Sequence, residues 1–377
     1  MYELRCLGEA TLRTSGGELV HFRSRKHLAL LIYLALNADR AHRRERLASM
    51  LWSDSDEPRA RHSLSQALYA VRRLLEGSVR IEGDDLEIDT NGLYVDVLEL
   101  ERHLDRGQPA DAADLFRGDF LEGFWVRGAR GYEQWVFHER ARLSALARDA
   151  LRQAIKTAHD RCDWTDVRSR AERLVGLEPF DEQAYAELMR ALWMLGDRAA
   201  ALDRYEGLKR ILADELQASP SKETEALAQR IRQRPVRGGW NSRSLLREPD
   251  SALFVDPPFV GRKHELSVLA QQWRIVATGE SRTVALVGSA GIGKTRLATE
   301  FIKSLELEDV TVLRGRCYEA EQSLPYGPIA EALRQSLDKL DLSDVNPLWL
   351  AELARIVPEV HEILENLPSP PEQDAEK

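Results

Sequence analysis

Apolar and polar residues alternate in steps of two near the N-terminus of the chain. Tyr2, Leu4 and Cys6 lie on one side of the first alternating run, and further runs cover residues 10–14 and 19–22, with the turn sequence SGGE between them. Strict alternation places every second side chain on the same face of a strand. The pattern therefore predicts three short β-strands in the first 22 residues.

The spacing of apolar residues then changes to three and four, which predicts helices at residues 26–37, 43–52 and 57–76. Asp56 is the expected N-cap of the third helix, and Pro58 lies in its first turn. Proline is tolerated there because the N–H groups of the first turn have no acceptor within the helix. The core-facing stripe of this helix consists of Leu64, Leu68, Val71 and Leu75.

A second alternating stretch follows the third helix. Val79 and Ile81 alternate with polar residues before a turn at 83–85, and Leu86 and Ile88 alternate after it, as in a β-hairpin. Strands, three helices and a terminal hairpin in this order predict a winged helix-turn-helix domain over residues 1–95.

Residues 96–233 have helical spacing almost throughout and show a period of 34 residues. The repeated positions are Asp163, Val167, Leu174 and Leu177, which recur as Asp197, Ala201, Leu208 and Ile211. Such a period is typical of a tetratricopeptide (TPR)-like array of helical hairpins. Any array of helical hairpins would produce some of these coincidences, so the repeat type stays open at this point.

The composition of residues 234–256 predicts a linker, and residues 257–377 begin a different module. Strands are expected at 283–287 and 310–313, and the composition of the last nine residues is that of a disordered tail. The fold class expected is therefore multidomain and mainly α: a winged helix-turn-helix, a TPR-like helical array and an incomplete α/β P-loop module.

The composition excludes several classes of protein. Of 377 residues, 43% are apolar and 31% are charged, which is ordinary for a globular chain. The longest apolar run, residues 28–36, is short of the ~20 residues that cross a membrane, and no signal peptide precedes it. Three scattered cysteines argue against a disulfide framework or a zinc site. We expect a soluble, cytoplasmic protein that does not contact a membrane.

Charge is unevenly distributed along the chain. The net charge is −9, but residues 20–80 hold twelve basic and six acidic residues, a local net charge of +6. A basic segment in an acidic protein is typical of a surface that binds phosphates of nucleic acid. A solvated helical surface would give the same surplus, so charge alone leaves both interpretations open.

The candidate DNA contacts lie on the third helix and its neighbours. When its leucine stripe faces the core, its opposite side carries donor-rich side chains suited to base edges and phosphates. The expected contacts on this helix are Arg59, Arg61, His62, Ser65, Gln66, Tyr69, Arg72 and Arg73; Arg43, Arg44 and Arg46 on the preceding helix and Arg80 on the hairpin join them. A polar face without a partner is the alternative, and the order of the surrounding elements favours DNA.

An ordered set of motifs in residues 1–235 resembles the SARP-type bacterial transcriptional regulators. The motifs are RSRKHLALL at 23–31, RLASMLW at 46–52, ARHSLSQAL at 60–68 and GDFLEGF at 118–124, the last of which resembles the bacterial transcriptional activator domain of that family. The resemblance implies a sequence-specific regulator of promoter DNA that often forms a homodimer and helps to recruit RNA polymerase. Ser65 departs from the family, which commonly has a basic residue there.

The sequence GSAGIGKT at 288–295 fits the P-loop pattern G-x-x-x-x-G-K-[ST] in full. Glycines let backbone N–H groups converge on a β-phosphate, the lysine reaches the β and γ oxygens, and the threonine ligates Mg²⁺. The residues expected to hold ATP and magnesium are Gly288, Gly291, Ile292, Gly293, Lys294 and Thr295, with Thr295 as the magnesium ligand. A glycine-rich turn without a ligand is the alternative.

Motifs on both sides of this loop resemble the opening of a STAND-type AAA+ ATPase module. They are FVGR at 259–262 and LPYGP at 324–328. The resemblance places Arg262 near the nucleotide, and a structural salt bridge is an equal alternative for this residue.

ATP hydrolysis needs more than a P-loop, because an acidic residue at the end of a buried strand must hold the magnesium shell. The only later apolar run that ends in an acid is residues 348–352, and Pro347 with the helical spacing beyond it predicts a helix instead. The module is expected to be incomplete, as in a fragment of a longer protein or a shortened relative. We expect ATP to bind weakly without turnover.

Three functions fit these observations. The first is a DNA-binding transcriptional regulator, with a nucleotide-binding segment that modulates it. The second is a signalling NTPase whose N-terminal domains dock other proteins, and the third is a helical scaffold for a protein or peptide. The basic segment, the order of elements and the family motifs together favour the first.

Overall fold

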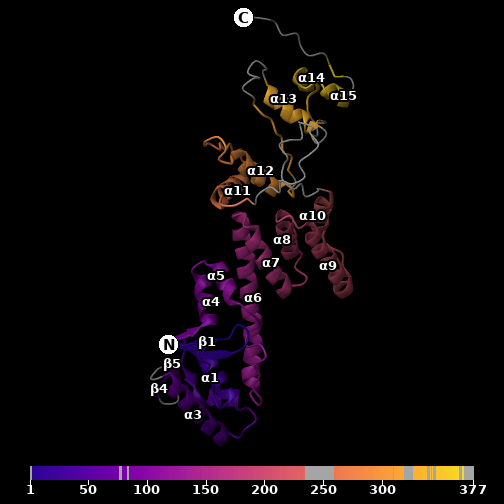
Figure 1. The fold of residues 1–377 in the computed structure, drawn as a ribbon. Coiled ribbons are helices and arrows are strands. Elements are labelled where there is room, and N and C mark those ends of the chain that lie inside the picture. The colour runs from indigo at the N-terminus through magenta and orange to yellow at the C-terminus, as the bar shows by residue number, and fades with distance from the viewer. Residues whose placement is uncertain are drawn as a thin grey trace, which may run out of the picture. The chain divides into compact units, whose positions relative to one another are not determined.

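A computed structural model describes residues 2–75, 79–82, 85–233, 259–308, 310–317, 326–337, 340, 342, 345–364 and 367–368. The chain divides into two compact units, Met1–Arg282 and Thr283–Lys377. Figure 1 shows the order of their elements along the chain. The expected linker and the expected C-terminal tail lie outside the described residues.

A three-stranded sheet begins the first unit. β1 (Tyr2–Arg5) is its central strand, antiparallel to β2 (Thr11–Thr14) and parallel to β6 (Leu93–Val95). The predicted third strand at 19–22 is wrong, because Leu19 forms only an isolated bridge with Arg13. The free edge of β1 is taken by β6, which arrives from the far end of the domain.

Three helices follow at the predicted places, namely α1 (Arg25–Leu36), α2 (Arg44–Leu51) and α3 (Glu57–Leu74). Residues 29–35 of α1 are all buried, which explains the apolar run in the sequence. The carboxylate of Asp56 accepts from the backbone N–H of Arg59 at 3.0 Å, so the predicted N-cap is confirmed.

The predicted hairpin forms from β4 (Val79–Glu82) and β5 (Asp85–Ile88), which are antiparallel. A short strand, β3 (His42–Arg43), joins β5 and completes a second sheet in the order β3-β5-β4. The prediction that Arg43 lies on a helix is therefore wrong. Its pairing with β5 holds Arg43 in extended conformation, and the helix begins one residue later.

Helices form the rest of the first unit, as the spacing predicted. They are α4 (Asp96–Asp105), α5 (Pro109–Leu115), α6 (Arg130–Asp160), α7 (Trp164–Leu177), α8 (Glu182–Met194), α9 (Arg198–Leu216) and α10 (Lys222–Gln233). The long helix α6 extends from the winged-helix elements to the helical hairpins (Figure 1). Asp163 and Asp197, which are 34 residues apart, are the N-caps of α7 and α9, so the period corresponds to a structural repeat.

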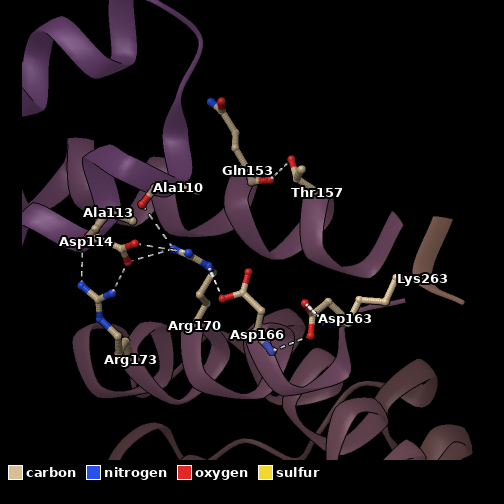
Figure 2. A network of polar contacts seen from close by, with 10 residues as sticks. All are labelled: Ala110, Ala113, Asp114, Gln153, Thr157, Asp163, Asp166, Arg170, Arg173 and Lys263. Atoms are coloured by element: carbon tan, nitrogen blue, oxygen red, sulfur yellow. Dashed lines mark hydrogen bonds and ion pairs between the residues drawn. The ribbon is translucent and has the colours of Figure 1, made fainter. Parts of the chain in front are cut away.

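A network of ion pairs connects α5 with α7. The guanidinium of Arg170, whose side chain is only 10% exposed, lies 3.2 Å from Asp114 on α5 and 2.8 Å from Asp166 on its own helix (Figure 2). Arg173 also reaches Asp114, at 3.3 Å. Because the planar guanidinium can donate to several oxygens at once, this network holds two segments that are distant in the sequence.

Helix α11 (Lys263–Ala277) belongs to the first unit as well and packs against α6. The ammonium group of Lys263 lies 2.5 Å from Asp163 at the N-terminus of α7, as Figure 2 shows, and Arg274 lies 3.1 Å from Asp160 at the end of α6. These contacts place α11 at the junction of α6 and α7.

The second unit contains α12 (Lys294–Leu305), α13 (Gly327–Arg334), α14 (Pro347–Ile356) and α15 (Val360–Ile363). A small apolar core joins α13, α14 and α15 through Ala330, Ala354 and Val360. Residues 348–352 lie within α14, which confirms their interpretation as a helix.

The strands expected at 283–287 and 310–313 are wrong, because neither segment forms a strand in the described part of this unit. A β-strand requires a hydrogen-bonded neighbour, and parallel strands are normally covered on both faces. Here Val287 is 93% exposed and Leu313 is 46% exposed.

Among all the described residues, no helix combines the length and the apolar content that crossing a membrane requires.

Candidate DNA interface and nucleotide loop

One face of α3 is buried in the winged-helix core, as its apolar stripe predicted. Leu64, Leu68, Val71 and Leu75 are between 0% and 7% exposed. Ala60 and Ala67 extend this buried stripe along the helix. Helices α1 and α2 lie against this side of α3. The helix therefore presents its opposite side outward.

The opposite side of α3 is open to solvent. The exposed residues on it are Arg59, Arg61, His62, Ser65, Gln66, Tyr69, Arg72 and Arg73. The aromatic residue Tyr69 is 69% exposed. Within the described residues, neither the strands of the domain nor the helical array covers this face, and a helix can enter a major groove only with such an open face.

Hydrogen bonds hold several of these side chains on the open face. The amide of Gln66 lies 3.0 Å from the imidazole of His62, one helical turn away. Ser65 donates to the backbone oxygen of Arg61 at 2.9 Å and accepts from the guanidinium of Arg44 on α2 at 3.0 Å. The contact between Arg44 and Ser65 joins the N-terminus of α2 to the middle of the candidate recognition helix.

The arginines at the start of α3 have acidic neighbours. Arg61 lies 2.5 Å from Glu57, and Arg59 lies 3.4 Å from Asp56. All four side chains are more than half exposed, and such surface ion pairs contribute only about 0–1 kcal/mol. These arginines can therefore exchange a carboxylate for a phosphate at little cost.

The remaining candidate cations flank α3. Arg43 and Arg46 are exposed and Arg44 is half-buried, so the N-terminal part of α2 brings positive charge beside the open face. The backbone of Arg80 pairs with Glu87 in the hairpin, and its side chain lies outside what the structure describes.

Sequence reasoning missed the contacts that join the winged helix to the helical array. Residues 118–124, which the sequence identified only as a motif, contact the segment that follows β1. The backbone N–H of Leu121 donates to the carbonyl of Cys6 at 2.8 Å, and that of Glu122 donates to the carbonyl of Gly8 at 2.9 Å. Arg140 on α6 donates to the carbonyl oxygens of Phe120 and Leu121, each at 2.7 Å. Gly118 and Gly123, which belong to this motif, were its only local signal.

A buried carboxylate completes the same junction. Asp96 is 5% exposed and accepts from the backbone N–H groups of Cys6, Leu7 and Val97, each at 2.9 Å. Burial raises the pKa of Asp96 above its ordinary value of 3.8, and these hydrogen bonds oppose the rise. Burial outweighs these hydrogen bonds, so the folded protein favours the protonated carboxyl more than water does.

The nucleotide loop lies in the second unit, immediately before α12. Gly291 and Gly293 have φ values of +79° and +97°, which are accessible to glycine without strain, and Gly293 is the N-cap of the helix. No other atom lies within 4 Å of the position of an added Cβ at either glycine. The backbone can therefore approach a phosphate closely at these positions.

The ammonium group of Lys294 folds back on this loop and donates to the carbonyl oxygens of Gly288 and Ser289, each at 2.9 Å. Thr295 is exposed in the first turn of α12, and Ile292 is half exposed at the top of the loop. The backbone donors and the open approach to the loop are compatible with a phosphate group.

Arg262 lies in the first unit, where its guanidinium pairs with Glu265 at 2.6 Å. This contact corresponds to the salt bridge that was one of its two interpretations. Among the described residues, no group of three His, Cys, Asp or Glu side chains is arranged to hold a metal ion.

Two family models match this chain over consecutive ranges. The bacterial transcriptional activator domain matches residues 99–232, and the AAA ATPase domain matches residues 258–377. The chain has the domain composition of a SARP-type transcriptional regulator. The resemblance seen in the sequence motifs, including the AAA-type module, is thereby confirmed.

The chain is also similar to individual proteins that are named as regulators. It is 28% identical over 306 residues to the regulatory protein AfsR of Streptomyces coelicolor, which covers 75% of this chain and 30% of AfsR. It is 26% identical over 228 residues to the transcriptional regulatory protein MoaR1 of Mycobacterium tuberculosis, covering 56% of this chain and 73% of MoaR1. The chain thus spans less than a third of the length of AfsR.

Among solved structures, a complex of Mycobacterium tuberculosis EmbR with a low affinity phosphopeptide aligns with a TM-score of 0.44 at 19% identity. The alignment covers 74% of this chain and 71% of the EmbR chain.

Proposed function

We propose that this chain is a sequence-specific DNA-binding transcriptional regulator that activates transcription from its target promoters. The observation that carries the proposal is the geometry of α3, whose leucine stripe is buried while its donor-rich face stays open to solvent. Side chains such as Gln66 and Arg73 have the donors that read adenine and guanine in a major groove. Arg43 and Arg46 then neutralise phosphates on the flank.

We further propose that the helical array carries the contacts of the regulator with other proteins. By the family resemblance, these partners are RNA polymerase and a second copy of the chain, in the cytoplasm where promoter DNA is found. The hairpins α7–α8 and α9–α10 form a repeated array of the kind that presents extended binding surfaces.

The nucleotide loop is proposed to hold ATP with Mg²⁺ and to modulate the regulator. The backbone of Gly291 and Gly293 would cradle the phosphates, Lys294 would neutralise the β and γ oxygens, and the hydroxyl of Thr295 would ligate the metal ion. Bound magnesium would neutralise phosphate charge. We expect no turnover from this chain, because the sequence offers no acidic residue at the end of a second buried strand.

The experiment that tests the proposal is selection of DNA from a random pool by the full chain. Enrichment of one sequence, with an affinity that falls steeply with salt, is the expected result. Gln66→Ala and Arg73→Ala should each relax the preference at one position and cost about 1–3 kcal/mol there. Arg168→Ala on α7 is the matched control and should bind like the wild type.

Two outcomes would count against this function. Unchanged affinity and specificity in both α3 variants would show that the open face of α3 does not recognise the DNA sequence. Phosphate release from ATP that disappears in Lys294→Ala, without any DNA selection, would favour a signalling NTPase instead.

A further inference from the structure

The turn between α2 and α3 is held by residues that precede and begin α6. The hydroxyl of Ser53, in the turn, donates to the carbonyl oxygen of Gly128 at 3.3 Å and accepts from the backbone N–H of Arg130 at 3.1 Å. Both hydrogen-bonding functions of this short side chain are therefore used by a segment 75 residues away. The helix-turn-helix and the helical array meet at this point.

Close backbone packing reinforces the same contact. An added Cβ on Gly131, in the first turn of α6, would lie 3.2 Å from both Cα and Cγ of Met50 near the end of α2. An added Cβ on Gly128, whose φ is +68°, would lie 2.1 Å from the carboxylate of Asp54. A side chain at Gly131 would require the backbone of Met50 to shift, and one at Gly128 would be strained by the positive φ and would displace the carboxylate of Asp54.

Lys26, near the N-terminus of α1, joins the two sides. Its ammonium group donates to the carbonyl oxygen of Gly128 at 3.3 Å, lies 3.7 Å from Asp54 and sits over the ring of Trp52 at 5.5 Å. Burial lowers the pKa of Lys26, and the nearby carboxylate of Asp54 opposes this shift. The contact thus extends over three elements of the winged helix.

We propose that Ser53, Gly128, Arg130 and Gly131, which we call the turn clamp, are positioning residues for DNA reading. The clamp sets the angle at which α3 leaves the turn. Because three of its residues precede or begin α6, the helical domain determines the orientation of the recognition helix relative to DNA. This inference rests on the proposed function. A conformational change in the helical array can therefore alter the orientation of α3, because packed interfaces shift between discrete arrangements and do not deform continuously.

The test uses two variants of the full chain, each with a matched control. Gly131→Ala brings a methyl group against the backbone of Met50, whereas Gly207→Ala places the same group in α9 with no other atom within 4 Å. Ser53→Ala removes the hydroxyl of the clamp, whereas Ser49→Ala removes one that only donates to its own helix at Arg46.

DNA selected by the wild-type chain is the first probe. Gly131→Ala and Ser53→Ala should each lower the affinity for that DNA about tenfold, about 1.4 kcal/mol, and leave binding to a scrambled sequence and its salt dependence unchanged. The thermal midpoint of Gly131→Ala should change little, because the higher helix propensity of alanine offsets the contact of its methyl group with Met50. Affinities equal to those of the controls would overturn the proposal, as would equal losses on both DNAs.

Hydrogen exchange of the free protein separates this inference from the proposed function. The amides at the start of α3 should exchange faster in both clamp variants than in both controls, because the turn is no longer held. Unchanged exchange overturns the clamp whatever the DNA result. Faster exchange together with a wild-type chain that selects no DNA would support a held turn but overturn its role in reading DNA, along with the proposed function.

Discussion

The guanidinium of Arg44 on α2 donates a hydrogen bond to the hydroxyl of Ser65 on α3 at 3.0 Å. Ser65 occupies a position at which SARP-type regulators commonly have a basic residue, and its neighbour thereby supplies a positive charge at that place. The positive charge that is absent at position 65 is thus supplied by Arg44 of the preceding helix, 21 residues earlier in the chain.

This arrangement predicts different roles for the two side chains. Arg44→Ala should weaken binding to selected DNA at every sequence and lower the slope of log affinity against log salt by about 1, because one phosphate contact is lost. Ser65→Ala should leave the slope unchanged, since it removes no charge. Affinity measured over a salt series checks both, with Arg168→Ala as the control, and an unchanged slope in Arg44→Ala would remove this arginine from the interface.

The carboxylate of Asp96 predicts a pH dependence of stability. Its folded pKa lies above the ordinary value, so between the two pKa values the folded state binds the proton more tightly than the unfolded state. The contribution of this group to the free energy of unfolding is therefore full below pH 3.8 and is lost as the pH rises through the raised folded pKa. Urea unfolding of wild type and Asp96→Asn at several pH values checks this.

In that comparison, the difference in unfolding free energy between the two proteins should change in this window and be flat well above it. A difference that is independent of pH would contradict the shift. Asp96→Ala should lower the free energy of unfolding by about 3 kcal/mol at neutral pH, because the buried N–H groups of Cys6 and Leu7 lose their acceptor.

The ion-pair network of Figure 2 predicts that Arg170 contributes to stability more than its neighbours on α7. Arg170→Ala should lower the free energy of unfolding by about 2 kcal/mol, less than a fully buried pair, because Asp114 is 58% and Asp166 40% exposed. Arg168→Ala breaks an exposed pair with Glu172 on the same helix and should cost less than about 1 kcal/mol. Equal losses in thermal unfolding would show that burial adds nothing here.

The nucleotide loop predicts a binding defect without a folding defect. Lys294→Ala should abolish the binding of a fluorescent ATP analogue in the presence of magnesium and leave the thermal midpoint unchanged, because its two hydrogen bonds are exposed. Lys303→Ala, in the last turn of the same helix, is the charge-matched control and should bind like wild type. Retained binding in Lys294→Ala would remove the loop from the nucleotide site.

Much of the first unit could be predicted because its signals are local. The N-caps Asp56, Asp163 and Asp197 act within three residues of their own position, and the stripe of α3 repeats every three or four residues. The strand at 93–95 was decided by pairing with β1 across the whole domain, and residues 19–22 form only an isolated bridge with Arg13 of β2. The strands expected around the P-loop failed for the same reason, since local composition does not provide a partner.

The amino-acid sequence by itself determined the helices, their caps, the P-loop and the residue types available on α3, because each depends on neighbours within one or two turns. Only the tertiary structure decided that the face of α3 is open, that Arg44 reaches Ser65, and that Ser53 is held by Gly128 and Arg130. These relationships join residues separated by 21 to 77 positions. No local pattern encodes them, because they arise when separate elements pack against one another.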